Sequence, residues 1–190
     1  MTPERSCSDH CPSFRDLRPA LWTGRFFYVR LAGLWDEVTM TGAILLHPQD
    51  TSDEDAMIAQ IARQVKVVAV VGLSPNTDRP SWGVARYLQS QGIRVIPVNP
   101  GHAGGTILNE TVYTDLAAIP ADAGVQMVDV FRRSDAVAGI VEQAMAHLPD
   151  LSVIWTQIGV RDDAAAQRAR DAGLTVIQDR CPKIEFPRHL

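Results

Sequence analysis

The chain has 190 residues, of which 46% are hydrophobic and 21% are charged, and its formal net charge is −4. This length and composition predict one globular domain, with room for an appendage. The acidic balance argues against general binding to nucleic acids or acidic membranes, and no apolar run approaches the roughly 18 residues that a membrane-spanning helix needs.

The first 40 residues differ from the rest of the chain, because they carry three prolines and bulky aromatic residues with no clean period. We expect residues 1–40 to form an irregular extension and residues 41–190 to form the domain. Two hypotheses stay open for the extension. Either translation starts at Met40 and the upstream piece is a gene-model extension, or the piece is a genuine flexible arm that docks its aromatic side chains on the domain or on a partner.

The three cysteines, Cys7, Cys11 and Cys181, do not form a disulfide framework. Cys7 and Cys11 flank His10, but a second pair of ligands at a suitable spacing is missing, so no metal site is predicted. No secretory signal is visible, and we expect the protein to reside in the reducing cytoplasm.

From Ser52 onward, amphipathic stretches alternate with short apolar runs. The spacing of the apolar residues predicts helices over 52–64, 82–90, 134–147 and 162–172. The apolar runs predict strands over 66–72, 94–98, 126–131, 152–156 and 174–178. The remaining segments are expected to be a loop with one short strand over 104–113, a short helix over 115–119 and an irregular tail over 179–190.

Five apolar strands that alternate with helices predict an α/β fold, in which helices cover both faces of a parallel sheet. Right-handed crossovers make this a three-layer, doubly wound, Rossmann-like fold. With the strands numbered along the chain, we expect the order 3-2-1-4-5. The ligand crevice of such a sheet lies where the winding reverses, which this order places at the carboxyl ends of strands one and four.

The stretch VVAVVGLSPNTDRPS, residues 67–81, joins a buried strand to a glycine turn, a polar loop and the start of a helix. This order is typical of the phosphate-holding half of a βαβ unit, because Gly72 permits a tight turn and the free N–H groups of a first helical turn attract an anion. The loop has neither a G-x-G-x-x-G pattern nor the lysine of a P-loop. The alternative is an ordinary first strand of an α/β domain, followed by a solvated loop with no ligand.

The second strand is followed by the turn Asn99-Pro100-Gly101-His102, which contains no acidic residue. A site for NAD would place Asp or Glu here to bind the ribose hydroxyls. A neutral Asn99 followed by His102 tolerates phosphate instead, which favours a ligand with an additional phosphate group. His102 is equally compatible with an exposed loop.

The third and fourth strands are followed by Phe131-Arg132-Arg133 and by Gln157-Ile158-Gly159. Arginines beside a crevice bind phosphate well, although this pair equally suits a solvated helix start, and at most one of the two is expected to point inward. A small residue such as Gly159 lets a ligand lie on the backbone.

Three further residues lie beside strand ends. Asp129 and Asp179 are predicted to be structural hydrogen-bonding residues, because no nucleophile and histidine accompany them. Cys181 is predicted to be a small buried residue, with a thiol that faces a ligand thiol as the alternative.

Four segments together resemble the YccU-like family of small stand-alone CoA-binding proteins: VVGLSPNTDRPSWGVARYLQSQGIRVIPVNP, VDVFRRSDAV, WTQIGVRDDAAAQRARDAGL and VIQDRCPKIE. The resemblance covers about residues 53–186. A more distant likeness is to the CoA-binding domain of the succinyl-CoA synthetase α subunit, whose turns resemble residues 98–101, 156–159 and 180–183. In that family a lysine follows the strand-two turn, where this chain has His102. The synthetase also needs a second domain and a partner chain, so ligase activity is not implied.

The resemblance implies a protein that binds coenzyme A or an acyl-CoA, with no catalytic residue and no metal site of its own. The CoA pyrophosphate is expected on the 72–81 loop. The adenosine end of the ligand is expected along the strand-two turn, and its pantetheine is expected to pass residues 157–159. The candidate CoA-binding residues are Gly72, Ser74, Pro75, Asn76, Arg79, Ser81, Asn99, Pro100, His102, Phe131, Arg132, Arg133, Gln157, Ile158 and Gly159. Two other classes stay open, namely an NAD(P)-dependent oxidoreductase and a CoA-responsive module that regulates or binds a partner. A homo-oligomer or an unidentified protein partner is also left open.

Overall fold

The computed structural model describes residues 54–189. The expected extension over residues 1–40, the Cys7, His10 and Cys11 group and the predicted helix start at Ser52 lie outside these residues. Within the described part of the chain, no helix is long and apolar enough to span a membrane.

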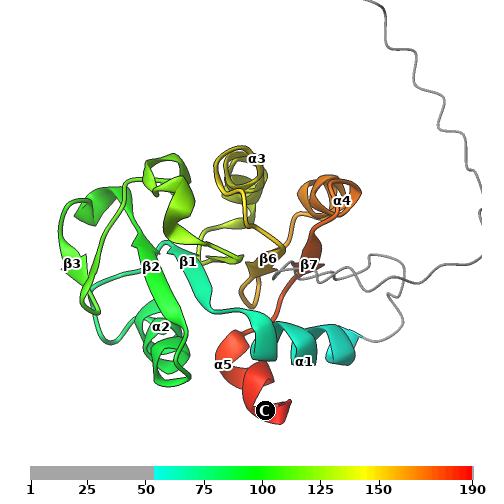
Figure 1. The fold of residues 1–190 in the computed structure, drawn as a ribbon, viewed down its shortest axis with the longest axis horizontal. Coiled ribbons are helices and arrows are strands. Elements are labelled where there is room, and N and C mark those ends of the chain that lie inside the picture. Colours follow the sequence, from blue (N-terminus) through cyan, green and yellow to red (C-terminus); the bar gives the residue numbers. More distant parts are fainter. Residues whose placement is uncertain (1–53, 190) are drawn as a thin grey trace, which may run out of the picture. The chain divides into compact units, whose positions relative to one another are not determined.

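Five parallel strands form the central sheet, namely β1 (Val67–Val71), β2 (Arg94–Val98), β5 (Met127–Val130), β6 (Val153–Thr156) and β7 (Thr175–Ile177). Each of them lies within a predicted strand. Helices α1 (Glu54–Gln64), α2 (Pro80–Ser90) and α5 (Pro182–Glu185) cover one face, and α3 (Val137–His147) and α4 (Asp163–Asp171) cover the other (Figure 1). The predicted doubly wound α/β fold is therefore confirmed.

Short elements fill the connections. An antiparallel pair, β3 (Thr106–Ile107) and β4 (Glu110–Thr111), follows β2, and 3-10 helices span Pro100–His102, Leu116–Ala118, Ala121–Ala123, Ser134–Ala136 and Phe186–Arg188. The short helix expected over 115–119 is thus a 3-10 turn, and it begins where Asp115 Oδ1 accepts a hydrogen bond from the Ala118 N–H at 3.0 Å.

The predicted strand order 3-2-1-4-5 is wrong. The sheet runs β2-β1-β5-β6-β7, so the third long strand, β5, pairs with β1 rather than with β2. On the outer side of β2, the Tyr113 N–H donates to the Pro97 carbonyl oxygen at 2.9 Å, so the missing N–H of Pro97 also faces outward and marks β2 as an edge strand. The winding therefore reverses between β1 and β5, and the loops after these two strands flank the crevice.

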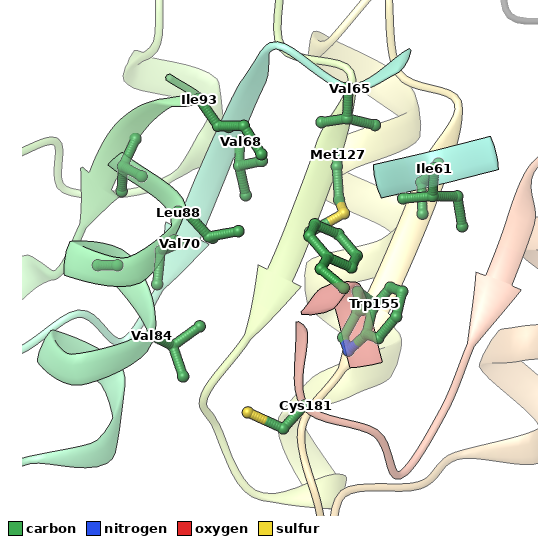
Figure 2. Close-up of a cluster of buried hydrophobic side chains, with 14 of the residues drawn as sticks. Ile61, Val65, Val68, Val70, Val84, Leu88, Ile93, Met127, Trp155 and Cys181 are labelled. Carbon is green, nitrogen blue, oxygen red and sulfur yellow. The ribbon is translucent and has the colours of Figure 1, made fainter. Parts of the chain in front are cut away.

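The core lies in two layers, one on each face of the sheet, because successive strand side chains point to opposite sides. Figure 2 shows the layer between the sheet and helices α1, α2 and α5. Leu88, Met127 and Trp155 are fully buried in this layer, and Cys181 is 9% exposed. Cys181 is thus the small buried residue that the sequence predicts.

The prediction of an irregular tail over 179–190 is wrong for residues 182–188, because α5 and the 3-10 turn after it pack on this layer. Phe186 is fully buried, and its ring meets Trp155 edge to face, with centroids 5.7 Å apart and planes at 89°. The indole Nε1–H of Trp155 donates to the Arg180 carbonyl oxygen at 2.7 Å. The buried Glu185 carboxylate accepts hydrogen bonds from Arg188 at 3.0 Å and from Arg180 at 3.5 Å, so charged groups also hold this segment in place.

Candidate functional site

The loops after β1, β2 and β5 meet at Gly72. Its N–H donates to the Val98 carbonyl oxygen at 2.8 Å, and its φ of 93° lies in the region that favours glycine. A Cβ at this position would lie 3.0 Å from the Phe131 carbonyl oxygen and 3.4 Å from Cδ and Nε of Arg132. The absence of a side chain at Gly72 therefore lets the Arg132 side chain lie directly over the turn.

Hydrogen bonds within the 72–81 loop occupy its serine and asparagine side chains. Ser81 Oγ accepts from the Ser74 N–H at 3.2 Å, Ser74 Oγ accepts from the Asn76 N–H at 3.2 Å, and Asn76 Oδ1 accepts from the Asp78 N–H at 2.9 Å. Ser81 is buried, whereas Pro75 and Asn76 are exposed. These polar side chains shape the loop, and their assignment to a CoA ligand stays a prediction.

The first turn of α2 lies beside this loop. The helix begins at Pro80, two residues before the predicted start, and no side chain caps it. Arg79 stands immediately before it and is exposed. Pro80 has no N–H, and the Trp82 and Gly83 N–H groups both donate to the Arg79 carbonyl oxygen, at 3.0 and 3.3 Å. The helix start therefore offers an anion the Ser81 N–H, the positive end of the helix dipole and the neighbouring Arg79 guanidinium.

Asn99 ties the turn after β2 to the loop after β1. Its Nδ2 donates to the Leu73 carbonyl oxygen at 2.8 Å, and its Oδ1 accepts from the Gly101 N–H at 3.1 Å. The neutral side chain at this position thus has a structural role, independent of any ligand. Pro100 and His102 follow in the 3-10 turn and are exposed, so they are free to contact a ligand from this side.

The two arginines after β5 point in different directions. Arg132 is half-buried over Gly72, whereas the Arg133 side chain is 88% exposed and pairs with Asp135 at 2.9 Å. A surface hollow of about 570 Å³ lies beside them, bordered by Val71 of β1 and Ile140 of α3. Of this pair, Arg132 is the residue placed at the point where the winding reverses.

Gln157 and Asp129 form a buried pair between the ends of β6 and β5. The Gln157 Nε2 donates to both carboxylate oxygens of Asp129, at 2.8 and 3.0 Å. Asp129 is fully buried, and this burial raises its pKa from 3.8 to about 7, against the lowering effect of the Gln157 hydrogen bond.

We expect the substitution Asp129→Asn to stabilise the protein at pH 8. Between about pH 4 and pH 7 the unfolded chain has released the Asp129 proton whereas the folded protein retains it, so stability falls as the pH rises through this window. An amide removes the buried charge and still pairs with Gln157. Urea unfolding should therefore show a stability gain at pH 8 that shrinks towards pH 5. The control is Asp135→Asn, which makes the same change at an exposed position. A stability gain of Asp129→Asn that is equal at pH 5 and pH 8 would contradict the prediction.

The rest of the loop after β6 is held by the loop after β7. The Gly159 N–H donates to Asp179 Oδ1 at 2.6 Å, and the Asp179 N–H donates to Thr156 Oγ1 at 3.3 Å. Asp179 is therefore a structural hydrogen-bonding residue, as the sequence predicts. Ile158, which precedes Gly159 in this loop, is 62% exposed and presents an apolar surface to solvent.

One cation near the site was not among the predicted residues. The Lys183 Nζ lies 3.8 Å from the position that a Cβ on Gly83 would take, in the first turn of α2. It is carried there by α5, in the segment that the sequence interpretation left irregular. Arg132 over Gly72 and Lys183 at the first turn of α2 thus come from two separate segments of the chain.

Comparison with known proteins identifies the family. A family model described as a CoA binding domain matches residues 66–187. The chain is 36% identical over 129 residues to the uncharacterized protein YneT of Bacillus subtilis (strain 168), which covers 68% of this chain and 91% of that protein.

Two solved structures share both sequence and fold with the chain. The structure of cell-free ID.343 from Thermus thermophilus is 31% identical, with a TM-score of 0.67, and covers 72% of this chain and 98% of that one. A hypothetical protein from Pyrococcus horikoshii OT3 is also 31% identical, with a TM-score of 0.65, and covers 70% of this chain and 90% of that one. The predicted resemblance is confirmed, and the chain belongs to the family of CoA-binding domains.

Proposed function

We propose that the protein binds coenzyme A or an acyl-CoA at the carboxyl edge of its sheet and carries out no catalysis of its own. The observation that carries this proposal is the match to a CoA binding domain over residues 66–187, the segment that forms the whole site. The pyrophosphate lies on the Gly72–Ser81 loop and the first turn of α2. The adenosine end lies along Asn99–His102, and the pantetheine passes Gln157–Gly159.

The charges at this edge suit a diphosphate. Arg79 immediately precedes α2 and the Lys183 Nζ lies at its first turn, while Arg132 lies over Gly72 at the other end of the same loop. The positive end of the helix dipole is itself favourable for an anion. Arginine and lysine both pair with phosphate oxygens. The exposed His102 at the strand-two turn adds a donor for a further phosphate, such as the one on the ribose of CoA.

We expect calorimetry on the full-length protein to show binding of CoA, weaker binding of dephospho-CoA and little binding of NAD⁺. The Arg79→Ala variant should weaken CoA binding by about tenfold or more, because it removes a charge-assisted contact to phosphate. The control is Arg168→Ala, which makes the same charge change on α4, where Arg168 pairs with Glu142 at 3.5 Å on an exposed surface. Binding of NAD⁺ without CoA would overturn the proposal and favour the oxidoreductase alternative.

A further inference from the structure

We propose that Asp129 and Gln157 form a proton-controlled relay at the floor of the site, which presents a hydrogen-bond acceptor to the ligand when Asp129 is ionised and a donor when it is protonated. The relay thereby sets the preference between free CoA, whose thiol is a donor, and an acyl-CoA, whose thioester carbonyl is an acceptor. This inference rests on the proposed function, because it assigns a ligand to the pantetheine end of the same site.

One polar atom of the Asp129–Gln157 pair has no hydrogen-bond partner within the described residues. A single atom of the Gln157 amide, Nε2, contacts both oxygens of Asp129. The other atom, Oε1, has no hydrogen-bond partner among residues 54–189. Within that range no fully buried side-chain nitrogen or oxygen lacks a partner, so Oε1 reaches solvent although Gln157 is only 8% exposed. Gln157 directly follows β6, so this open oxygen reaches solvent at the carboxyl end of that strand, where the pantetheine is proposed to pass.

Among residues 54–189, the Asp129 carboxylate has no cationic partner. Its neighbours in the sheet are Val70 of β1 and Trp155 of β6, and α2 contributes Val84 and Leu88 to this layer. In the described part of the chain, the Asp129 charge acts on the Cys181 thiol. Burial is the main cause that raises the pKa of this thiol, so it stays neutral near pH 7.

Lys183 interacts with Cys181 in turn, and its Nζ lies at the start of α2. Because the pKa of Asp129 is about 7, the pH decides whether its carboxyl group is ionised or protonated, and Gln157 is its hydrogen-bond partner in the structure.

The two protonation states favour opposite orientations of the amide. An ionised carboxylate only accepts, so the Gln157 Nε2 faces Asp129 and Oε1 faces solvent at the end of β6. A protonated carboxyl still accepts at its carbonyl oxygen but also carries an O–H, and Gln157 is the hydrogen-bond partner of Asp129 within residues 54–189. The O–H therefore gains an acceptor when the amide rotates by half a turn, so that Oε1 faces Asp129 and Nε2 faces solvent. The two ends of an amide have nearly the same size, so the rotation needs no repacking. The pKa of Asp129 near 7 populates both states at physiological pH.

The test compares CoA with acetyl-CoA on the full-length protein, by calorimetry between pH 5.5 and 8.5. We expect the ratio of the two affinities to shift by about threefold to tenfold in favour of acetyl-CoA as the pH falls through about 7, the range that one hydrogen bond accounts for. The ratio cancels the titration of the ribose phosphate, since both ligands carry the same phosphate.

Three variants separate the relay from other causes. In Asp129→Asn and in Gln157→Met the ratio should no longer depend on pH, because the first removes the titrating group and the second removes the amide. In Cys181→Ala the dependence should persist. If both ligands bind with a ratio that is constant with pH, the relay is refuted while the proposed function stands. If neither ligand binds, the proposed function itself fails.

A measurement without ligand examines the relay directly. The side-chain amide resonances of Gln157, followed by NMR, should titrate with a midpoint near pH 7 in the unmodified protein and stay constant in Asp129→Asn. Resonances that do not move over this range would refute the relay whatever the ligand.

Discussion

Replacing Gly72 with alanine is expected to destabilise the protein by about 3 kcal/mol and to abolish most of its CoA binding. The φ of 93° strains any residue with a side chain, and the new Cβ would lie 3.0 Å from the Phe131 carbonyl oxygen. Backbone on the neighbouring strand cannot yield as a flexible side chain can. The loops after β1 and β5 must separate, and Arg132 moves with them. Urea unfolding and CoA calorimetry measure the two effects.

The chain offers a matched control in Gly92, which follows α2. Its φ is 78°, but a Cβ there would meet nothing within 4 Å. The Gly92→Ala variant therefore carries the backbone strain without the contact, at a cost of about 1 kcal/mol. We expect it to bind CoA normally. Equal losses of stability and binding in the two variants would show that the contact with Phe131 is unimportant.

Replacing Trp155 with alanine should cost about 4–5 kcal/mol, a large share of the roughly 5–15 kcal/mol that holds a typical domain folded. The side chain is fully buried, packs edge to face on Phe186 and donates to the Arg180 carbonyl oxygen. The cavity would remove the ring on which Phe186, directly after α5, packs. Thermal and urea unfolding report the loss, and a change of less than about 2 kcal/mol would contradict it.

A milder substitution isolates the hydrogen bond. Trp155→Phe keeps most of the buried ring and leaves the Arg180 carbonyl without its donor, at a cost of about 1–3 kcal/mol. The control is Trp82→Phe, because Trp82 is only partly buried and its ring lies beneath Arg86, 5.8 Å from the guanidinium carbon. We expect CoA binding to weaken in Trp155→Phe, since Arg180 and Lys183 belong to one short segment.

The sequence was sufficient for the five strands of the sheet and for the four long helices, because buried parallel strands appear as continuous apolar runs and the helices have an apolar period. The strand order was missed although a local signal was present: Pro97 cannot donate to a further strand, which excludes β5 from that side of β2. The tail was also missed. Its few apolar residues show no helical period, and α5 spans only four residues, so it is held by contacts with Trp155 and α2 rather than by its own pattern.

The residues of the candidate site also fall into those that a local sequence signal predicted and those that only tertiary packing brings together. Gly72 and Arg132 were predicted, because a glycine after a strand and an arginine after its neighbour are local signals. The pairing of Asp129 with Gln157 depends on the register between β5 and β6, in which Asp129 stands opposite Trp155, two residues before Gln157. Lys183 reaches Gly83 across about 100 residues of chain, through tertiary packing that no local pattern encodes.

The internal hydrogen bonds of the 72–81 loop have a consequence for the speed of binding. Ser74, Asn76 and Ser81 already hold the loop in one conformation, and Asn99 anchors its first residues to the neighbouring turn. A ligand then has no segment to order here, so little conformational entropy is lost on arrival. We therefore expect association at this loop to be governed by diffusion and by attraction between phosphate and the surrounding cations, whereas the residence time reflects the contacts made afterwards.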